Sequence, residues 1–210
     1  LLFMCSGYYR YSAGYTPDRP GLEEFAGTVV HPQLGPDDLD YSNKRVAVIG
    51  SGATAVTLIP AMADKASHVT MVQRSPTYIL SMPSKDRLAN LLNRLMPAAW
   101  AYACTRWRNI RFQNYFYKQA IERPAKIRAY ILKRLRKALA PEIDVEKHFT
   151  PSYDPWTQRL CLVPDSDLFH VLNSGKASVI TGTIARITSD GIEMQGGELI
   201  EADVLVTATG

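Results

Sequence analysis

The stretch that decides the fold is Arg45-Val-Ala-Val-Ile-Gly50-Ser-Gly52-Ala-Thr-Ala55, which is followed by Val69-Thr-Met-Val-Gln73-Arg74. A run of β-branched and small apolar residues stops at Gly50, a helix-compatible run starts after Gly52, and a second apolar run ends in Arg74. This order of strand, glycine turn, helix and strand is typical of a β-α-β unit whose turn reads G-x-G-x-x-A. The expected fold class is therefore α/β, with a Rossmann-like three-layer architecture.

The glycine turn is suited to hold a phosphate. Gly50 permits a tight turn, Gly52 lets the backbone approach a pyrophosphate, and Ala55 is small enough for close packing of helix and strand. The start of the helix then offers N–H groups to the anion. The alternative is a glycine-rich turn that binds nothing. The candidate cofactor-binding residues of the turn are Gly50, Ser51, Gly52, Ala53, Thr54 and Ala55.

The end of the second strand indicates which dinucleotide binds. Sites specific for NAD usually place a carboxylate there to bind the ribose 2′-hydroxyl. Here the strand ends in Gln73-Arg74-Ser75, without an acid. A guanidinium can bind the 2′-phosphate of NADP through two hydrogen bonds. The sequence therefore predicts NADPH as the cofactor, with Arg74 as the phosphate ligand.

Positive charge is concentrated in one segment of the chain. Residues 85–137 contain 14 Lys and Arg against two acids, whereas the rest of the chain holds 10 basic and 18 acidic residues. Apolar residues recur every four positions from Ile127 to Leu139, with cations between them, which predicts a helix with one apolar face. Prolines divide the segment into about three helices. We therefore expect a basic helical insertion over residues 85–140.

Three interpretations of the insertion stay open at this point. Its basic face could simply be solvated, or a basic amphipathic helix could lie on an anionic membrane surface. Its aromatic residues could also stack on nucleic-acid bases. We expect them instead to pack the core of the insertion, so no nucleic-acid partner is predicted. These aromatic residues are Trp100, Trp107, Phe112, Tyr115, Phe116 and Tyr117.

Cysteine and histidine usage indicates the compartment and excludes some site types. Three scattered cysteines without a C-x-x-C pair favour a reducing compartment, so we expect a cytoplasmic protein. The four histidines show no metal-ligand spacing, and no metal site is predicted. The longest apolar run, from Met96 to Cys104, is far too short to span a bilayer.

Strand patterns return after the insertion. A short helix over residues 167–172 precedes a strand over 177–180. Residues 183–187 and 191–194 flank a turn signal that is typical of a hairpin, and residues 203–207 form the last apolar run. The sequence therefore predicts a β-meander followed by a returning strand.

Both ends of the chain have the same pattern. Leu1–Cys5 and Asp203–Thr207 are apolar runs, read as strands, and each leads into a turn of small residues. A complete protein rarely begins and ends in this way. We therefore expect this chain to be a piece of a longer protein.

Further motifs follow one another in the order seen in one enzyme family. Phe25-Ala-Gly27-Thr-Val-Val-His31 resembles the fingerprint F-x-G-x-x-x-H-x-x-x-W, and the glycine turn is followed by Gln73-Arg74-Ser75-Pro76. Trp156-Thr-Gln-Arg159-Leu resembles the segment that carries the active-site arginine, and Ala208-Thr209-Gly210 resembles the returning hinge. On these residues the chain is similar to the flavin-dependent Baeyer–Villiger monooxygenases of the flavin-containing monooxygenase superfamily, especially to their ethionamide-activating type.

The resemblance implies two cofactors, FAD and NADP, and a reaction with molecular oxygen. NADPH reduces the flavin, and one oxygen atom of O2 is inserted into a ketone to give an ester or lactone, or is transferred to a sulfur compound. The resemblance also implies that Arg159 and His31 are catalytic and that Ser75 and Gln158 bind cofactor. Two alternatives stay open. Arg159 could be a salt-bridged surface residue, and His31 could orient the hinge or only hydrogen-bond its own loop.

The chain departs from the family pattern at two points. The final aromatic of the fingerprint falls on Gly35, and the family's FAD-binding glycine motif is not found before Leu1. We therefore expect the NADPH-binding part of such an enzyme, without its flanking FAD domain and inactive alone. The expected divisions are a hinge strand, fingerprint loop and first part of the NADPH-binding domain over 1–84, the insertion over 85–140, and the remainder with the returning hinge strand over 141–210.

Two other functions stay open. The chain could be a stand-alone NADP-binding module without catalysis, because the FAD motif is missing. It could also be a fragment that interacts with a membrane surface through the basic insertion. The expected partners are a small ketone or thio compound, molecular oxygen, and a membrane contacted peripherally by the insertion.

Overall fold

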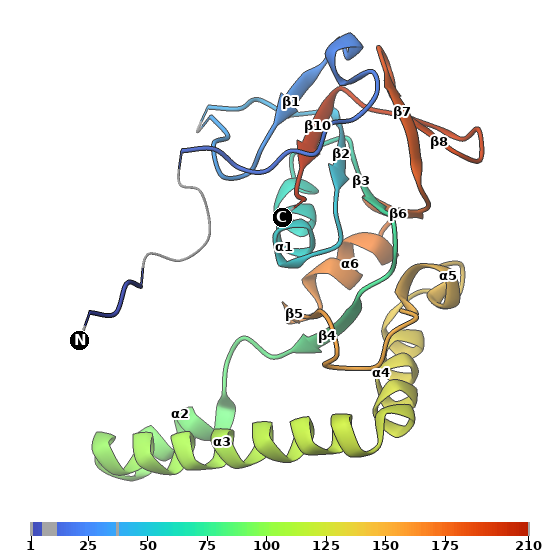
Figure 1. The fold of residues 1–210 in the computed structure, drawn as a ribbon. Helices are drawn as coiled ribbons and strands as arrows, with labels where there is room; N and C mark the ends of the chain where they lie inside the picture. The colour runs from blue at the N-terminus through green and yellow to red at the C-terminus, as the bar shows by residue number, and fades with distance from the viewer. Residues whose placement is uncertain (1, 6–11, 37, 210) are drawn as a thin grey trace. The chain divides into compact units, whose positions relative to one another are not determined.

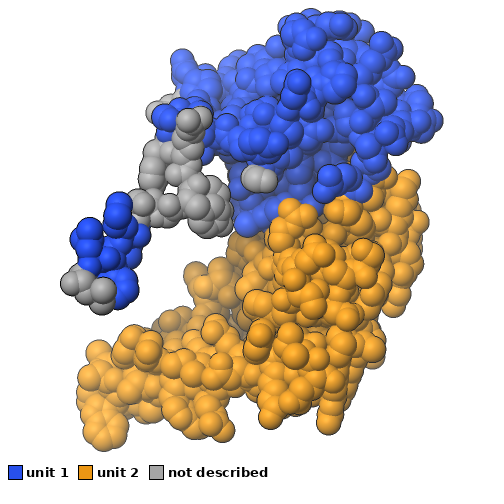
Figure 2. Space-filling model, in the orientation of Figure 1, with its two compact units in different colours: residues 1–74, 182–210 blue, residues 75–181 orange. Residues whose placement is uncertain are grey.

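The computed structural model describes residues 2–5, 12–36 and 38–209 (Figure 1). The chain forms two compact units, which are coloured separately in Figure 2. Unit 1 comprises residues 1–74 and 182–210, and unit 2 comprises residues 75–181. Unit 1 is therefore assembled from two parts of the chain that are far apart in sequence. The three-part division at residues 84 and 140 stays a prediction.

Helices and strands both contribute to the fold, which confirms the predicted α/β class. The elements of unit 1 are η1 (Leu22–Glu24), β1 (Thr28–Val30), β2 (Arg45–Ile49), α1 (Ala53–Met62), β3 (His68–Gln73), β7 (Ile184–Thr188), β8 (Gly191–Met194), β9 (Leu199–Glu201) and β10 (Val204–Thr207). The elements of unit 2 are β4 (Tyr78–Met82), α2 (Arg87–Leu95), α3 (Ala98–Glu122), α4 (Pro124–Ala138), α5 (Val145–Phe149), β5 (Leu160–Pro164), α6 (Asp167–Asn173) and β6 (Ala177–Thr181).

The centre of unit 1 is a parallel sheet. Strands β1, β10, β2 and β3 lie side by side in that order, and each neighbouring pair is parallel. Helix α1 packs on β2 and β3, as the predicted β-α-β unit requires. The strands β2 and β10 are buried almost throughout, which explains why both are continuous apolar runs rather than alternating ones.

The predicted β-meander is confirmed. Strands β7, β8 and β9 form a separate antiparallel sheet in that order. Gly191 follows the turn between β7 and β8 with φ +155°, a conformation that glycine adopts most easily. A side chain there would also meet the carbonyl oxygen of Ile200.

An ion-pair cluster joins the beginning of β2 to the segment before β10. The Arg45 guanidinium donates to Asp203 Oδ1 at 2.8 Å and pairs with Glu201, and the Arg45 backbone N–H donates to Asp203 Oδ2 at 2.8 Å. These hydrogen bonds from Arg45 lower the pKa of Asp203 to about 2. Because Val46 pairs with Val204 in the next ladder position, the cluster holds the register of the two strands at their amino ends.

Unit 2 contains a second, smaller sheet and most of the helices. Strands β4 and β5 are parallel partners, with Tyr78 opposite Leu160, and α4 packs on β4. The side chains that recur every four residues in α4 are buried, which confirms the predicted apolar face. Asp86 caps α2 by accepting from Ala89 N at 3.0 Å and also pairs with Arg108, so α2 is tied to α3.

The prolines divide the insertion as predicted. Pro97 precedes α3, Pro124 is the first residue of α4, and Pro141 lies beyond its end. Proline fits the first turn of a helix because that N–H has no partner within the helix. No helix in the described part of the chain has both the length and the apolar character needed to cross a membrane.

Two expectations differ from the structure, and one pair of strands was not expected. Residues 2–5 form no strand, and their apolar side chains are exposed, because an extended segment becomes a strand only beside a pairing edge. The pair formed by β4 and β5 was not foreseen. The insertion's aromatic residues do not pack a core: among the named six, all but Phe116, which is partly buried, are exposed. Tyr117 only contacts the ring of Trp156, edge to face, with centroids 6.0 Å apart.

Candidate functional site

The candidate site of unit 1 lies at one edge of the parallel sheet. Because β1, β2, β3 and β10 run in the same direction, their carboxyl ends meet at that edge. The residues that follow the four strands are His31, Gly50, Arg74 and Ala208. In open α/β sheets, ligands bind outside the carboxyl ends of the strands, where connections leave in opposite directions. Here β2 continues through α1 to β3 on one side and has β10 on the other.

The turn after β2 leaves space beside the backbone of one of its two glycines. Gly50 has φ +143°, and a Cβ atom there would lie 2.4 Å from the carbonyl oxygen of Ala208. Gly52 is different, because a Cβ atom there would meet nothing within 4 Å. The open space beside Gly52 is where a ligand would lie against the backbone. Ala55 is fully buried, which allows α1 to pack closely on the sheet.

The start of α1 also suits an anion. The helix begins after Gly52 without a side-chain cap, and its first turn contains no acidic residue. Ala53 and Thr54 are exposed, and Thr57 is occupied by a hydrogen bond from its hydroxyl to Ala53 O at 2.9 Å. The partial positive charge of a helix N-terminus therefore faces open space. Ser51, by contrast, is buried within the turn. These features fit the pyrophosphate of a dinucleotide.

A second arginine, Arg19, has a charge that interacts with the charge of Arg74. Desolvation and then the positive charge of Arg74 lower the pKa of Arg19 from its ordinary value. The Nε atom of Arg19 is buried and has no hydrogen-bond partner among the described residues. Two guanidinium groups that repel each other are stabilised when an anion lies between them. An anion bound near Arg74 would reduce the repulsion between Arg74 and Arg19.

His31 follows β1 at the same edge of the sheet. Its Nδ1 accepts a hydrogen bond from the backbone N–H of Gln33 at 3.2 Å. A Cβ atom at Gly14 would overlap the His31 ring, so the backbone of residue 14 passes directly against the imidazole. These contacts favour the interpretation in which His31 supports its own loop. A role of His31 in hinge motion or catalysis stays a prediction.

Arg159 belongs to unit 2, where its backbone is anchored. The buried Tyr78 hydroxyl donates to Tyr153 O at 2.8 Å, and the Tyr153 hydroxyl donates to Arg159 O at 2.8 Å. The two tyrosine rings pack edge to face with centroids 5.4 Å apart. We call the hydrogen-bonded chain from Tyr78 through Tyr153 to Arg159 O the tyrosine relay. In the same segment, Trp156 adopts φ +70°, a left-handed conformation that is unusual for a bulky residue. The segment before β5 is thus held in a defined, partly strained shape.

The side chain of Arg159 is exposed. Its charge acts on Cys161, where it opposes the rise in pKa that burial of the thiol causes. Gln158 and Ser75, the other predicted cofactor ligands of unit 2, are also exposed. The structure therefore brings His31, the glycine turn and Arg74 to one edge of unit 1, whereas Ser75, Gln158 and Arg159 are placed within unit 2.

Sequence reasoning missed Arg19 and the tyrosine relay. Both depend on contacts between residues distant in sequence. No local signal indicated the two tyrosines, because Tyr78 and Tyr153 are 75 residues apart in the sequence. No cluster of potential metal ligands occurs among the described residues.

A sheet edge with a glycine turn, an open helix start and an arginine directly after β3 is typical of a dinucleotide-binding domain. Comparison with known proteins agrees: residues 1–149 match the family described as flavin-binding monooxygenase-like. The chain belongs to this family.

Individual relatives are similar over the whole chain. The FAD-containing monooxygenase EthA of Mycobacterium tuberculosis is 50% identical over 211 residues, and EthA of Mycolicibacterium smegmatis is 48% identical. Each comparison covers 100% of this chain and 43% of the relative, so the chain spans less than half the length of these proteins.

Solved structures share the fold. An oxidized steroid monooxygenase bound to NADP matches with a TM-score of 0.72 and 21% identity, over 94% of this chain and 44% of the other. The OTEMO complex with FAD and NADP matches with a TM-score of 0.70 and 20% identity, over 94% and 45%. At this identity the likeness concerns the fold alone.

Proposed function

We propose that this chain is the NADPH-binding part of an FAD-dependent monooxygenase. The whole enzyme inserts one oxygen atom of O2 into ketones, giving esters or lactones, or oxidises sulfur compounds. The observation that carries the proposal is the sheet edge of unit 1, where the turn at Gly50 and Gly52 lies at the same edge as Arg74. The names of the relatives, which are FAD-containing monooxygenases, support the flavin assignment. The scattered cysteines favour a cytoplasmic enzyme.

Each residue then has a distinct task. The N–H groups at the start of α1 bind the pyrophosphate, and Arg74 with Arg19 binds the 2′-phosphate. FAD, when bound, accepts the hydride from NADPH and activates oxygen. Arg159 supplies a fixed positive charge, because a guanidinium stays protonated at every working pH. Such a charge stabilises the negative oxygen that develops when a ketone carbonyl is attacked. The hydrogen bonds from Tyr78 to Tyr153 O and from Tyr153 to Arg159 O hold the Arg159 backbone, which supports this proposed role.

One assay on the intact protein distinguishes the proposed enzyme from the alternative, a stand-alone NADP-binding module. The proposed enzyme consumes oxygen and NADPH faster when a simple ketone or a thioamide is added, and the product contains one added oxygen atom. A module without catalysis binds NADPH and consumes neither. The choice between ketone and thioamide as substrate follows from which product forms.

We also propose that the insertion contacts a membrane surface peripherally. Between Trp100 and Ile121, α3 has seven positions that are spaced alternately three and four residues apart. Five of these positions carry exposed apolar side chains, and the other two carry small or polar residues. This spacing places them on one face of the helix. We call this face the α3 stripe; its members are Trp100, Trp107, Ile110, Tyr117 and Ile121, which are between 42% and 71% exposed.

Charge favours lipid over a second copy of the chain. The α3 stripe is flanked by Arg106, Arg111 and Lys118. In a pair of identical helices these cations would face one another, which is unfavourable. Anionic headgroups would neutralise them, while tryptophan and tyrosine rings suit the interface between headgroups and acyl chains.

A vesicle assay tests the membrane contact. We expect the full-length protein to bind phosphatidylcholine vesicles only when they contain phosphatidylglycerol. Changing Trp100 and Trp107 to alanine should weaken binding about ten-fold or more, because each ring buries a large apolar surface. Changing Tyr102 and Tyr115, which are equally exposed on other faces of α3, should change it little. Equal loss in both double variants, or a dimer that only the Trp100 and Trp107 changes disrupt, overturns the proposal.

A further inference from the structure

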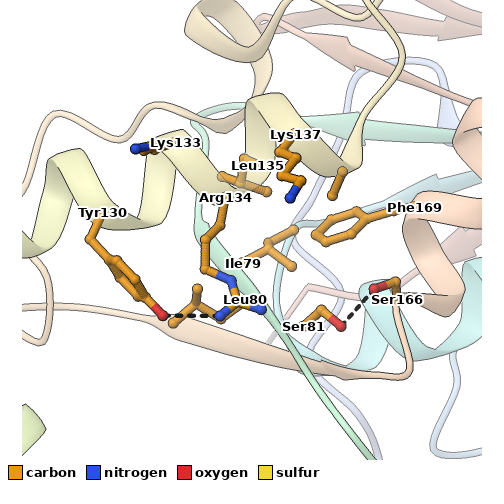
Figure 3. Close-up of a pocket in the computed structure, with 11 residues that line it drawn as sticks. Ile79, Leu80, Ser81, Tyr130, Lys133, Arg134, Leu135, Lys137, Ser166 and Phe169 are labelled. Atoms are coloured by element: carbon orange, nitrogen blue, oxygen red, sulfur yellow. Dashed lines mark hydrogen bonds between the residues drawn. The ribbon is translucent and has the colours of Figure 1, made fainter.

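Unit 2 contains a cavity that the proposed reaction does not use. Its volume is about 630 Å³, and it lies between β4, the second half of α4 and the beginning of α6 (Figure 3). Ligand pockets for small molecules usually have roughly 300–1,000 Å³. The cavity is therefore large enough for a small organic ligand.

One wall of the cavity is cationic. Lys133, Arg134 and Lys137 line it from α4, where their spacing places them on neighbouring positions of one helix face. Arg134 is already oriented, because its Nη1 donates to the Tyr130 hydroxyl at 3.0 Å and its guanidinium lies 5.8 Å from the centre of the Tyr130 ring. None of the residues that line the cavity is acidic. The wall therefore attracts an anion.

The floor of the cavity is apolar. Ile79, Leu80, Leu135 and Phe169 converge on it from three elements, as Figure 3 shows. All four side chains are mostly buried in the core of unit 2, so the floor is rigid. An apolar floor beneath a cationic wall suits a molecule with a hydrocarbon part and a charged end, rather than a small inorganic anion.

A pair of hydroxyl groups lies at the edge of the cavity. Ser166 Oγ donates to Ser81 Oγ at 2.7 Å, which leaves the pair with one further O–H to donate. Ser166 and Asp165 both adopt left-handed backbone conformations, with φ +64° and +47°. Left-handed backbone is costly for residues with a side chain. The Asp165 carboxylate holds this turn by accepting from Ser84 N at 3.0 Å.

We propose that this cavity binds an amphipathic carboxylate, such as a medium-chain fatty acid. The hydrocarbon chain covers the floor formed by Ile79 and Phe169. The carboxylate accepts hydrogen bonds from Arg134 and Lys137, and Ser81 adds a neutral donor. The proposal concerns a site separate from the dinucleotide turn and does not depend on the monooxygenase reaction.

Titration calorimetry on the full-length protein tests the proposal with decanoate below its micelle concentration. We expect decanoate to bind and two partial probes to fail: acetate, which lacks the chain, and decyltrimethylammonium, which lacks the anion. The change Lys137→Glu should weaken decanoate binding about ten-fold or more. Lys126→Glu, an exposed change of the same kind on α4, serves as the matched control and should leave binding near wild type.

The remaining outcomes each oppose the proposal. Equal binding of acetate shows an unselective anion site, and equal binding of decyltrimethylammonium shows an unselective apolar surface. An equal loss in Lys126→Glu shows general charge attraction. Ala138→Phe fills the cavity without changing any charge, and unaltered decanoate binding by that variant places the ligand elsewhere. Binding only to vesicles that contain decanoate, and not to free decanoate, also overturns the site.

Discussion

Replacing Arg159 with alanine in the intact protein is expected to lower the rate of ketone oxygenation by about 10²–10³ while NADPH still binds. The proposed role of Arg159 gives the reason: the variant loses the positive charge that would stabilise the developing negative oxygen. Anaerobic reduction of the flavin by NADPH should stay near the wild-type rate, because that step precedes the attack on the ketone. The measurement is ester formation alongside flavin reduction.

Two companion variants separate charge from position. Arg159→Lys keeps a positive charge but loses the planar guanidinium, and should recover part of the rate. Tyr153→Phe removes the hydrogen bond to Arg159 O without touching its side chain, so a smaller loss is expected. Ester formation near the wild-type rate in Arg159→Ala would reduce Arg159 to a surface arginine and remove the catalytic assignment.

Arg74→Ala is expected to narrow the preference for NADPH over NADH by about ten-fold to a hundred-fold, measured as the ratio of kcat/KM for the two cofactors. A lost charge-assisted hydrogen bond costs on the order of 1.5–3 kcal/mol, which corresponds to that range. The loss should appear with NADPH, because NADH carries no 2′-phosphate. Arg19→Ala should act in the same direction if both guanidinium groups hold the phosphate.

Lys65→Ala is the matched control for cofactor preference. Lys65 is exposed and lies before the amino end of β3, at the opposite edge of the sheet from Arg74. Its removal changes the net charge of the protein by the same amount but should leave the ratio unchanged. An unaltered ratio in Arg74→Ala, or an equal fall in Lys65→Ala, contradicts the assignment of Arg74.

Local patterns in the sequence predicted much of the fold. The strand that stops at Gly50, the helix after Gly52 and the hairpin before Gly191 follow from short-range rules on glycine and apolar periodicity, and the structure contains all three. The proline boundaries of α3 and α4 are equally local. The family resemblance added candidates that periodicity cannot indicate, such as Arg159.

Long-range contacts were not predictable in the same way. The strands β4 and β5 are short apolar runs that are separated in the chain by three helices and a small fourth one. Neither run contains a pattern that indicates the strand with which it pairs. The aromatic side chains of α3 were expected to be buried and are mostly exposed. Their burial depends on what packs against the helix and not on its composition. Arg19 approaches Arg74 only in the folded chain.

The position of β10 has a consequence for how the protein is made. This strand lies between β1 and β2, although Val204 of β10 pairs with Val46 of β2, which is 158 residues earlier in the chain. A nascent chain therefore carries β1 and β2 with unpaired inner edges until β10 has been synthesised. Such edges are templates for association between chains, and pairing over long sequence separation is slow. Chaperone demand during biogenesis thus follows from the middle of the sheet being completed last.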